Sequence, residues 1–335
     1  MAITEWDDYL IHQTAKTIDA MESDDIDAME RFYVGCHNAE GTLHFTSGLG
    51  SYPNRNIMDG YVCVRHNDVQ YNLRVSRHLQ GDRTNTKVGP LSFKVIEPLK
   101  RWGVHIDDND YGIRGSVEFE GRGAPYLTAP RAHYDHLGRF KGSITLEGQQ
   151  FSVDSFIGAR DRSWGMRRPN IFMEQDWGGH FWIQVHFSSF CLTLVCTGWW
   201  SETGRCGGAI LNDDGSVIPI TEMRHRIAFM PTVRALNSVE MLLTDVNDKQ
   251  RHLIAKRISP VNYLNGGGYD RPGEDRGPLS IEGEKWDVSQ MADESSPRFG
   301  LHQQIAEFQL DGEPGVGILE ASFNAFKERE YKPSW

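Results

Sequence analysis

The segment Val69-Gln-Tyr-Asn-Leu-Arg-Val-Ser76 alternates apolar and polar side chains from one residue to the next. Successive side chains of a β-strand point to opposite faces, so this alternation predicts a strand with one apolar face and one polar face. Strands of this kind are typical of antiparallel sheets. Further strands are predicted in the segments that begin at Leu91, Trp102, Val117, Ile144, Trp182, Phe190, Met241, Leu253, Ile305 and Val316.

Turn residues separate these predicted strands. His66-Asn-Asp68, Asp107-Asp-Asn-Asp110 and Leu137-Gly138 are signals for hairpin turns. No predicted strand is followed by a helical pattern long enough to connect two parallel strands. We therefore predict an all-β protein with two consecutive antiparallel β-barrel or sandwich domains.

The length of the chain also favours two domains, since 335 residues exceed one ordinary hydrophobic core. We expect a first β-domain over residues 31–168 and a second over residues 169–335. Residues 1–30 are expected to form a helical segment, with an amphipathic helix over residues 4–21 and a further helical turn over residues 23–29. Its predicted apolar face contains Trp6, Leu10, Ile11, Ile18 and Met21.

The charge pattern restricts the partners of the protein. The net charge is −11, and the lysines and arginines are scattered rather than grouped, which argues against nucleic acid as a partner. The first residues lack the pattern of a signal peptide, and no window reaches the ~18 apolar residues of a membrane helix. We expect a cytoplasmic protein without stable membrane insertion, for which a homodimer stays open.

The sequence contains no recognisable cofactor site. The five cysteines, at irregular spacings, are expected to be reduced and mostly buried. Gly266-Gly-Gly268 follows no strand-to-helix junction, so it is not a dinucleotide fingerprint. In His133-Tyr-Asp-His136 the alternation of a strand sends neighbouring side chains to opposite faces, which argues against a metal site. We expect no metal and no organic cofactor.

Four arginines surround a single carboxylate in the segment Gly158-Ala-Arg-Asp-Arg-Ser-Trp-Gly-Met-Arg-Arg-Pro169. One interpretation is a structural ion-pair network in which Asp161 joins two sheets. The other is a functional acid, because carboxylates whose pKa is perturbed by burial and charge are also frequent at active sites. The residues of the segment leave both interpretations open.

Within that segment, Asp161-Arg-Ser-Trp-Gly165 resembles the central motif of the carotenoid 1,2-hydratase / AttH-like superfamily of two-domain lipocalin-like proteins. Other segments resemble the N-terminal half of uncharacterised bacterial members, so that the likeness spans most of the chain after about residue 30. These segments are Gly41-Thr-Leu-His-Phe45, Tyr52-Pro-Asn-Arg-Asn56, Asp59-Gly-Tyr61 and Val88-Gly-Pro90. The resemblance implies two lipocalin-like β-domains.

The resemblance also implies catalytic residues. In those hydratases the aspartate of the motif is thought to protonate an alkene with support from an upstream histidine. By this likeness Asp161 is the predicted acid, and His133 or Tyr134 is its predicted helper.

Protonation of an alkene leaves a carbocation, which an aromatic wall stabilises. Trp164 is expected to supply this wall. Arg160 and Arg162 flank the acid and are expected to favour its carboxylate form. The other predicted substrate-binding residues are Arg160 itself, Trp177, His180, Trp182 and His186. For the two histidines, a hydrogen-bonded position in the core is the alternative.

We therefore predict a cofactor-independent lyase or isomerase of the hydratase, dehydratase or cyclase type. Its substrate would be a hydrophobic isoprenoid, steroid or polyketide-like molecule in an apolar pocket between the two domains. The alternative is a lipocalin-like protein that binds a hydrophobic small molecule without turnover. The enzyme requires Asp161 to face a cavity, whereas the binding protein only requires Asp161 to be paired and buried.

Overall fold

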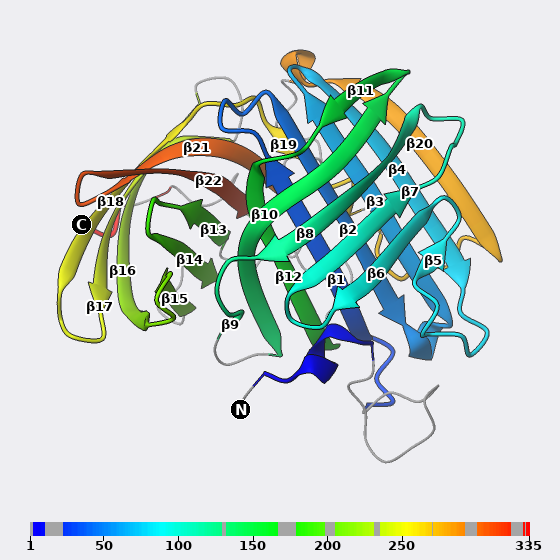
Figure 1. Ribbon diagram of the computed structural model, residues 1–335, viewed down its shortest axis with the longest axis horizontal. Helices are drawn as coiled ribbons and strands as arrows, with labels where there is room; N and C mark the ends of the chain where they lie inside the picture. The colour runs from blue at the N-terminus through cyan, green and yellow to red at the C-terminus, as the bar shows by residue number, and fades with distance from the viewer. Residues whose placement is uncertain are drawn as a thin grey trace.

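The computed structural model describes residues 3–10, 23–128, 132–166, 179–197, 205–230, 235–269, 271–291, 300–322, 331 and 333–335. In this part of the chain nearly all regular structure is β-strand, arranged in two large sheets (Figure 1). The described helical pieces are short 3-10 turns, namely η1 (Glu5–Asp8), η2 (Pro53–Arg55) and η4 (Val288–Gln290). The predicted all-β class with two antiparallel units is confirmed. None of the described helices has the length and apolar character needed to cross a membrane.

The first sheet has 13 strands among the described residues. Its main path runs in the order β20-β4-β3-β2-β1-β12-β10-β8-β7-β6-β5, while β9 and β11 pair with β10. The strands are β1 (Ala28–His37), β2 (Leu43–Tyr52), β3 (Ile57–His66), β4 (Val69–His78), β5 (Lys87–Val88), β6 (Leu91–Glu97), β7 (Arg101–Ile106), β8 (Ile113–Gly121), β9 (Tyr126–Leu127), β10 (His133–Leu146), β11 (Gln149–Ser152), β12 (Phe156–Met166) and β20 (Leu279–Asp287).

This sheet curls so that its two halves enclose one apolar core. Phe32 of β1 stacks on Phe93 of β6 at 5.7 Å and meets Trp102 of β7 edge-on at 4.8 Å between ring centroids. In the sheet order, β1 and β7 are separated by three strands. The contacts therefore cross the interior of the first unit, which the apolar residues of the alternating strands fill.

The second sheet is a closed barrel. Its nine strands follow the order β18-β17-β16-β15-β14-β13-β22-β21-β19, and β18 also pairs with β21, which closes a ring of eight strands. The strands are β13 (His180–His186), β14 (Phe190–Thr197), β15 (Arg205–Asn212), β16 (Val217–Phe229), β17 (Leu236–Asp245), β18 (Gln250–Arg257), β19 (Asn262–Tyr263), β21 (His302–Leu310) and β22 (Glu313–Ser322).

One strand from the second half of the sequence belongs to the first sheet. β20 pairs along its whole length with β4, so that Leu279 lies opposite Arg77 and Asp287 opposite Val69. It covers the edge that β4 would otherwise expose (Figure 1). The boundary predicted between residues 168 and 169 lies within residues 167–178, which are outside the described part of the chain. The division into two domains therefore stays a prediction.

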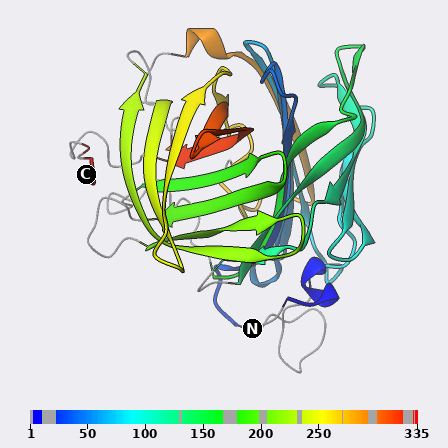
Figure 2. The same cartoon turned by 60° about the vertical axis from the view of Figure 1, so that its left-hand side comes forward.

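The two units contact each other through the outer face of the first sheet. A buried apolar cluster joins Tyr33, Leu137 and Ala159 of the first unit to Trp182 and Ile305 of the second. Figure 2 shows the barrel beside the long strands of the first sheet. The outer face of the first sheet around Tyr33, Leu137 and Ala159 is therefore covered by the second unit.

Three predictions of local structure need correction or lie outside the description. A helix was predicted over residues 4–21. The structure describes this segment only as far as Leu10, where it contains the single 3-10 turn η1. Residues 11–22 are not described. The helical turn predicted over residues 23–29 is wrong, because β1 already begins at Ala28. The turn predicted at Leu137-Gly138 is also wrong, because both residues lie inside β10 and pair with β12.

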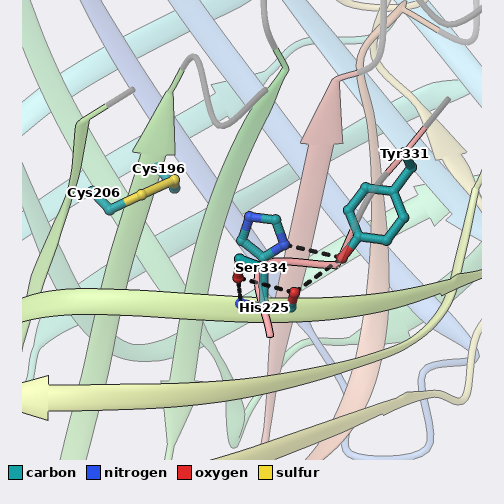
Figure 3. Close-up of a disulfide and its surroundings, with 5 residues drawn as sticks. All are labelled: Cys196, Cys206, His225, Tyr331 and Ser334. Atoms are coloured by element: carbon teal, nitrogen blue, oxygen red, sulfur yellow. Dashed lines mark hydrogen bonds between the residues drawn. A yellow bond between two sulfur atoms is a disulfide. The ribbon is translucent and has the colours of Figure 1, made fainter. Parts of the chain in front are cut away.

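The prediction that all cysteines are reduced is wrong for two of them. Cys196 and Cys206 lie opposite each other on β14 and β15 and form a disulfide (Figure 3). Pairing along the two strands holds these side chains next to each other, which the sequence spacing did not reveal. Cys36, Cys63 and Cys191 are free and buried.

The C-terminal residues bind to the strand β16. The hydroxyl of Tyr331 donates to the carbonyl of His225 at 3.0 Å and lies 3.1 Å from Nδ1 of the same histidine. The hydroxyl of Ser334 accepts from the backbone N–H of His225 (Figure 3). These bonds give partners to the part of β16 that has no strand-pairing partner in β15.

Candidate active site

The pairing of β12 with its two neighbours brings three ionisable side chains into one row. Asp161 of β12 lies opposite Tyr33 of β1 on one side and opposite Asp135 of β10 on the other. Residues that are directly opposite in a sheet send their side chains to the same face. Tyr33 belongs to the cluster between the two units, so the whole row faces the second unit.

The same alternation sends the flanking arginines to the opposite face. The guanidinium of Arg160 forms a buried ion pair with Asp8 at 2.6 Å, and that of Arg162 pairs with buried Glu30. Both pairs lie inside the first unit, where Arg160 also stacks over Trp102 at 3.9 Å. The expectation that these arginines hold Asp161 in its carboxylate form is therefore wrong, because a strand separates neighbouring side chains onto different faces.

His133 lies between the two carboxylates. Its Nε2 atom is 3.6 Å from Oδ2 of Asp161 and 3.8 Å from Oδ1 of Asp135. Its other ring nitrogen, Nδ1, is 2.6 Å from the hydroxyl of Thr128. His133 is 24% exposed and Asp161 is 19% exposed, whereas Asp135 is fully buried. The histidine and Asp161 can therefore meet a ligand, and Asp135 cannot.

Asp135 is held by donors from the second unit. Nε1 of Trp182 donates to Oδ1 at 3.1 Å, and Nε2 of Gln184 and the hydroxyl of Thr193 donate to Oδ2 at 3.3 and 2.8 Å. Burial raises the pKa of Asp135, and the charge of His133 opposes this shift. The arrangement fixes one carboxylate at the contact of the two units, where it can orient the imidazole of His133.

A second polar group adjoins this row. The hydroxyl of Tyr33 donates to Gln303 at 3.1 Å, and Gln303 donates to Glu320 at 2.6 Å. Glu320 also lies 3.2 Å from Nε2 of His180. Burial and the charge of Glu320 raise the pKa of Tyr33, so that its hydroxyl keeps its proton. The ring of Trp182 meets that of Tyr33 edge-on at 5.3 Å and connects the two groups.

Of the predicted site residues, the structure thus brings together Asp161, His133, Trp182 and, through Tyr33 and Glu320, His180. Tyr134 is not a neighbour of Asp161, because it points into the first unit and its hydroxyl donates to Asp8.

Two further predicted residues lie elsewhere, and a third is not described. Trp164 is on the inner side, where its ring is 6.4 Å from that of Tyr134, so its predicted role as a wall beside Asp161 is wrong. His186 is a buried core residue whose Nε2 atom donates to the carbonyl of Gly158 at 2.8 Å. Trp177 lies outside the described residues.

Sequence reasoning missed Asp135, Tyr33 and Glu320 as members of the site. For Asp135 a signal was present, since it follows His133 by two residues and a strand places such residues on one face. For Tyr33 and Glu320 no local pattern exists, because they reach the site only through the pairing of distant strands.

Among the described residues, no group of three or more histidine, cysteine, aspartate or glutamate side chains has an arrangement that would hold a metal ion. The expectation of a protein without a cofactor stays a prediction.

Solved structures show what this fold is similar to. The crystal structure of kievitone hydratase from Nectria haematococca matches 89% of the chain over 90% of its own length, with a TM-score of 0.51 and 8% identity. The crystal structure of CghA with Sch210972 matches 88% of the chain over 88% of its own length, with a TM-score of 0.54 and 10% identity. At such identities the likeness concerns the fold, which in both cases extends over both β-units.

The search among curated proteins found no match. A family model matches residues 3–325, which is nearly all of the chain. The chain belongs to the Family of unknown function (DUF8625).

Proposed function

We propose that the protein is a cofactor-independent lyase or isomerase that performs acid/base chemistry on a hydrophobic small molecule between its two β-units. One observation carries this proposal. His133 lies within ion-pair distance of two carboxylates, Asp161 and Asp135, of which one is partly exposed and the other is buried and fixed. Paired carboxylates in unlike environments, with a histidine between them, are typical of sites that transfer protons.

The three residues would have separate roles. Asp161 exchanges a proton with the substrate, since it is the exposed carboxylate. His133 exchanges a proton with Asp161 and returns it to the protonation state that the next turnover needs. Asp135 is a positioning residue, which keeps the imidazole in place through its own bonds to the second unit.

In the hydration direction, the carboxyl of Asp161 gives its proton to one carbon of a carbon–carbon double bond, and a cation forms at the other carbon. Water then forms a carbon–oxygen bond at that cation and loses a proton to His133, which passes a proton to the carboxylate of Asp161 and so restores the starting state. Dehydration is the reverse. Cyclisation follows when a second double bond attacks the cation in place of water, and the new cation that results loses a proton to His133 to give the neutral product. The buried rings of Tyr33 and Trp182 lie beside the row and would stabilise positive charge.

The comparisons support this class of reaction without identifying a substrate. One structural neighbour is named a hydratase, and another was solved with the small molecule Sch210972. The proposed substrate remains an isoprenoid, steroid or polyketide-like molecule with at least one double bond, and a nucleic acid partner is not proposed.

The proposal is tested by Asp161→Asn, which keeps the shape of the side chain but removes its exchangeable proton. Wild-type protein and variant are incubated with a panel of unsaturated isoprenoids, steroids and polyketides in H₂¹⁸O or D₂O, and products are analysed by mass spectrometry. Hydration adds the mass of labelled water, and a proton-initiated cyclisation incorporates deuterium. We expect turnover by the wild type and a loss of at least ~100-fold in the variant, the usual scale for a general acid or base.

Stability measurements on the same samples complete the test. Because Asp161 is partly exposed and pairs with His133 rather than with a buried arginine, Asp161→Asn should change the free energy of unfolding by less than about 1 kcal/mol. Asp108→Asn, in an exposed loop, is the matched control and should retain full turnover. If the panel binds but no product forms, the protein is a binding protein and the catalytic proposal fails. If Asp161→Asn turns over like the wild type, Asp161 is not the acid and the proposed mechanism fails.

A further inference from the structure

A small pocket lies against the outer face of the first sheet, beside the residues of the candidate active site. Charged side chains form most of its polar lining, namely Arg31, Arg74, Arg271, Arg276, Asp59 and Glu274. Its volume is about 20 Å³, just above the roughly 10–15 Å³ that one water molecule needs. The pocket therefore has room for one small polar group but not for a whole organic molecule.

Arg31 differs from the other arginines of this lining in its lack of a counter-charge. The other three each have a glutamate oxygen nearby, at 2.8, 3.0 and 3.4 Å. Arg31 is only 4% exposed, yet no carboxylate of the described residues lies within 4.0 Å of its guanidinium. Buried charges are usually paired, because an unpaired charge is costly to remove from water. A buried guanidinium without a carboxylate therefore favours a ligand that supplies the negative charge.

One edge of the Arg31 guanidinium is open. Its Nη1 atom donates to the hydroxyl of Tyr52, and its carbon lies 4.7 Å from the centre of the ring of Tyr269. Its Nε and Nη2 atoms have no hydrogen-bond partner in the described part of the chain, and protein atoms do not enclose them as they enclose Nε of Arg160 and Arg162. The tyrosines thus fix the plane of the group, and the free edge presents two parallel donors that match the two oxygens of a carboxylate.

Asp59 does not occupy this edge. It lies on the same row of the sheet as Arg31, with Gly50 between them. Its Oδ2 atom accepts a hydrogen bond from the backbone N–H of Gly273 at 2.6 Å, and it is farther from Arg31 than the 4.0 Å of an ion pair. Burial also raises the pKa of Asp59. The Nε–Nη2 edge of Arg31 therefore remains available to a ligand.

Arg31 lies on the same face of the sheet as the candidate active site. Ser163 of β12 is opposite Arg31 on one side and opposite His133 on the other, and opposite residues share a face. Ser163, His133 and Asp161 are all partly exposed. Two strand spacings separate Arg31 from His133, which is about 10 Å. One molecule of modest length can therefore contact both residues.

We propose that Arg31 binds the carboxylate of the molecule on which Asp161 and His133 act, so that the substrate is an unsaturated carboxylic acid. The Nε–Nη2 edge of Arg31 donates two hydrogen bonds to the carboxylate, and the reacting double bond lies about 10 Å away. Since the net charge of −11 repels acids, their binding requires such a local cation. This inference rests on the proposed function for the position of the double bond, whereas the binding is measured without turnover.

The probe is geranic acid, an unsaturated isoprenoid acid, and methyl geranate is its neutral counterpart. Isothermal titration calorimetry should show one geranic acid per chain, bound at least ~tenfold more tightly than the ester, the usual lower scale for hydrogen bonds to a charged group. Arg31→Gln should bring this ratio of affinities close to one. Arg114→Gln, on an exposed side chain of the same sheet, is the matched control and should keep the ratio.

Nuclear magnetic resonance locates the bound acid. In ¹⁵N-labelled protein, the arginine Nε–H signal that disappears in Arg31→Lys should move downfield when geranic acid is added, and should not move with the ester. Arg31→Lys keeps the charge but lacks the two-donor edge, so it should lower the ratio of affinities at least ~threefold. If circular dichroism shows that Arg31→Gln does not fold, Arg31→Lys replaces it.

The inference fails if folded wild type does not bind geranic acid more tightly than the ester, if the Arg31 variants keep the wild-type ratio, or if the Arg31 signal does not move. It also fails if acetate moves this signal at the same concentrations as geranic acid, because the pocket would then hold only a free small anion.

The proposed function can fail separately. Asp161→Asn should bind geranic acid like the wild type, because Arg31 and not Asp161 holds the carboxylate. Arg31-dependent binding without turnover of any member of the substrate panel would refute the catalytic proposal alone. Turnover of neutral members of the panel that Arg31→Gln leaves unchanged would refute the carboxylate inference alone.

Discussion

At the scale of single residues, the side chains of β12 alternate between the two faces of the first sheet, which separates its arginines from Asp161. Its inward arginines make buried ion pairs, and its outward carboxylate contacts a histidine at the surface between the units. Asp8 shows how strongly the inward set is connected. It accepts hydrogen bonds from Arg160, from the hydroxyl of Tyr134 and from the backbone N–H of Leu99. The carboxylate of Asp8 therefore attaches the N-terminal segment to the first unit, and the guanidinium of Arg162 adds a hydrogen bond to the carbonyl of Tyr9 at 2.8 Å.

This attachment leads to a prediction for Asp8→Asn. The variant leaves the guanidinium of Arg160 buried without its counter-charge, and loss of one partner of a buried pair costs about 3–5 kcal/mol. Urea denaturation should show this loss of unfolding free energy. Glu5→Gln, an exposed carboxylate on the same turn, is the control and should be within about 0.5 kcal/mol of the wild type. A loss below about 1 kcal/mol for Asp8→Asn would contradict the structural role given to this ion pair.

At the scale of elements, a row of glycines lets the first sheet curl. Gly121, Gly138 and Gly158 lie opposite one another on β8, β10 and β12. A Cβ atom on Gly158 would lie 2.0 Å from the carbonyl oxygen of Gly35, and one on Gly138 would lie 2.3 Å from that of Glu120. The strands approach too closely here for any side chain, which is typical of positions where a sheet bends strongly.

Gly158→Ala should therefore destabilise the protein by about 1–3 kcal/mol, the usual cost of overpacking, because backbone rather than a flexible side chain obstructs the added methyl group. Thermal or urea denaturation measures the effect. Gly207→Ala is the matched control, since Gly207 also lies in a strand but has nothing within 4 Å of the added atom. If both variants lost the same stability, close approach of β1 and β12 would not be the reason for the glycine.

At the scale of the whole molecule, buried histidines connect stability to pH. Burial is the largest cause that lowers their pKa values, to about 3 for His136 and His186 and to about 4 for His37 and His225. Between pH 6.5 and these values the unfolded chain binds protons that the folded chain does not. The stability that depends on these neutral histidines is therefore fully present above about pH 6.5 and is lost as the pH falls toward their lowered pKa values.

Each of these histidines should lower the free energy of unfolding by about 2 kcal/mol when the pH falls from 7 to 5, since one pH unit corresponds to about 1.4 kcal/mol per proton. Asp59 and Asp135, whose pKa values burial raises, act in the opposite direction but are fewer. Melting temperatures measured from pH 7.5 to pH 5 should fall steeply. His186→Gln keeps a donor for the carbonyl of Gly158 but does not titrate, so it should reduce this slope, whereas His105→Gln, on an exposed side chain, should not. An unchanged slope in His186→Gln would show that this histidine does not link stability to pH.

The local pattern of the sequence determined the type of secondary structure, because the two-residue period of a strand is written directly in segments such as Val69–Ser76. It did not show that Arg160 and Arg162 point away from Asp161, because that depends on the strand β12, which was not predicted at this segment. Likewise, the Cys196–Cys206 disulfide, the attachment of β20 to β4 and the row of Tyr33, Asp161 and Asp135 depend on which distant strands pair and in which register. Strand register is set by the packing of whole faces and not by the residues of one strand, so only the tertiary structure decided which carboxylates, histidines and aromatic rings meet.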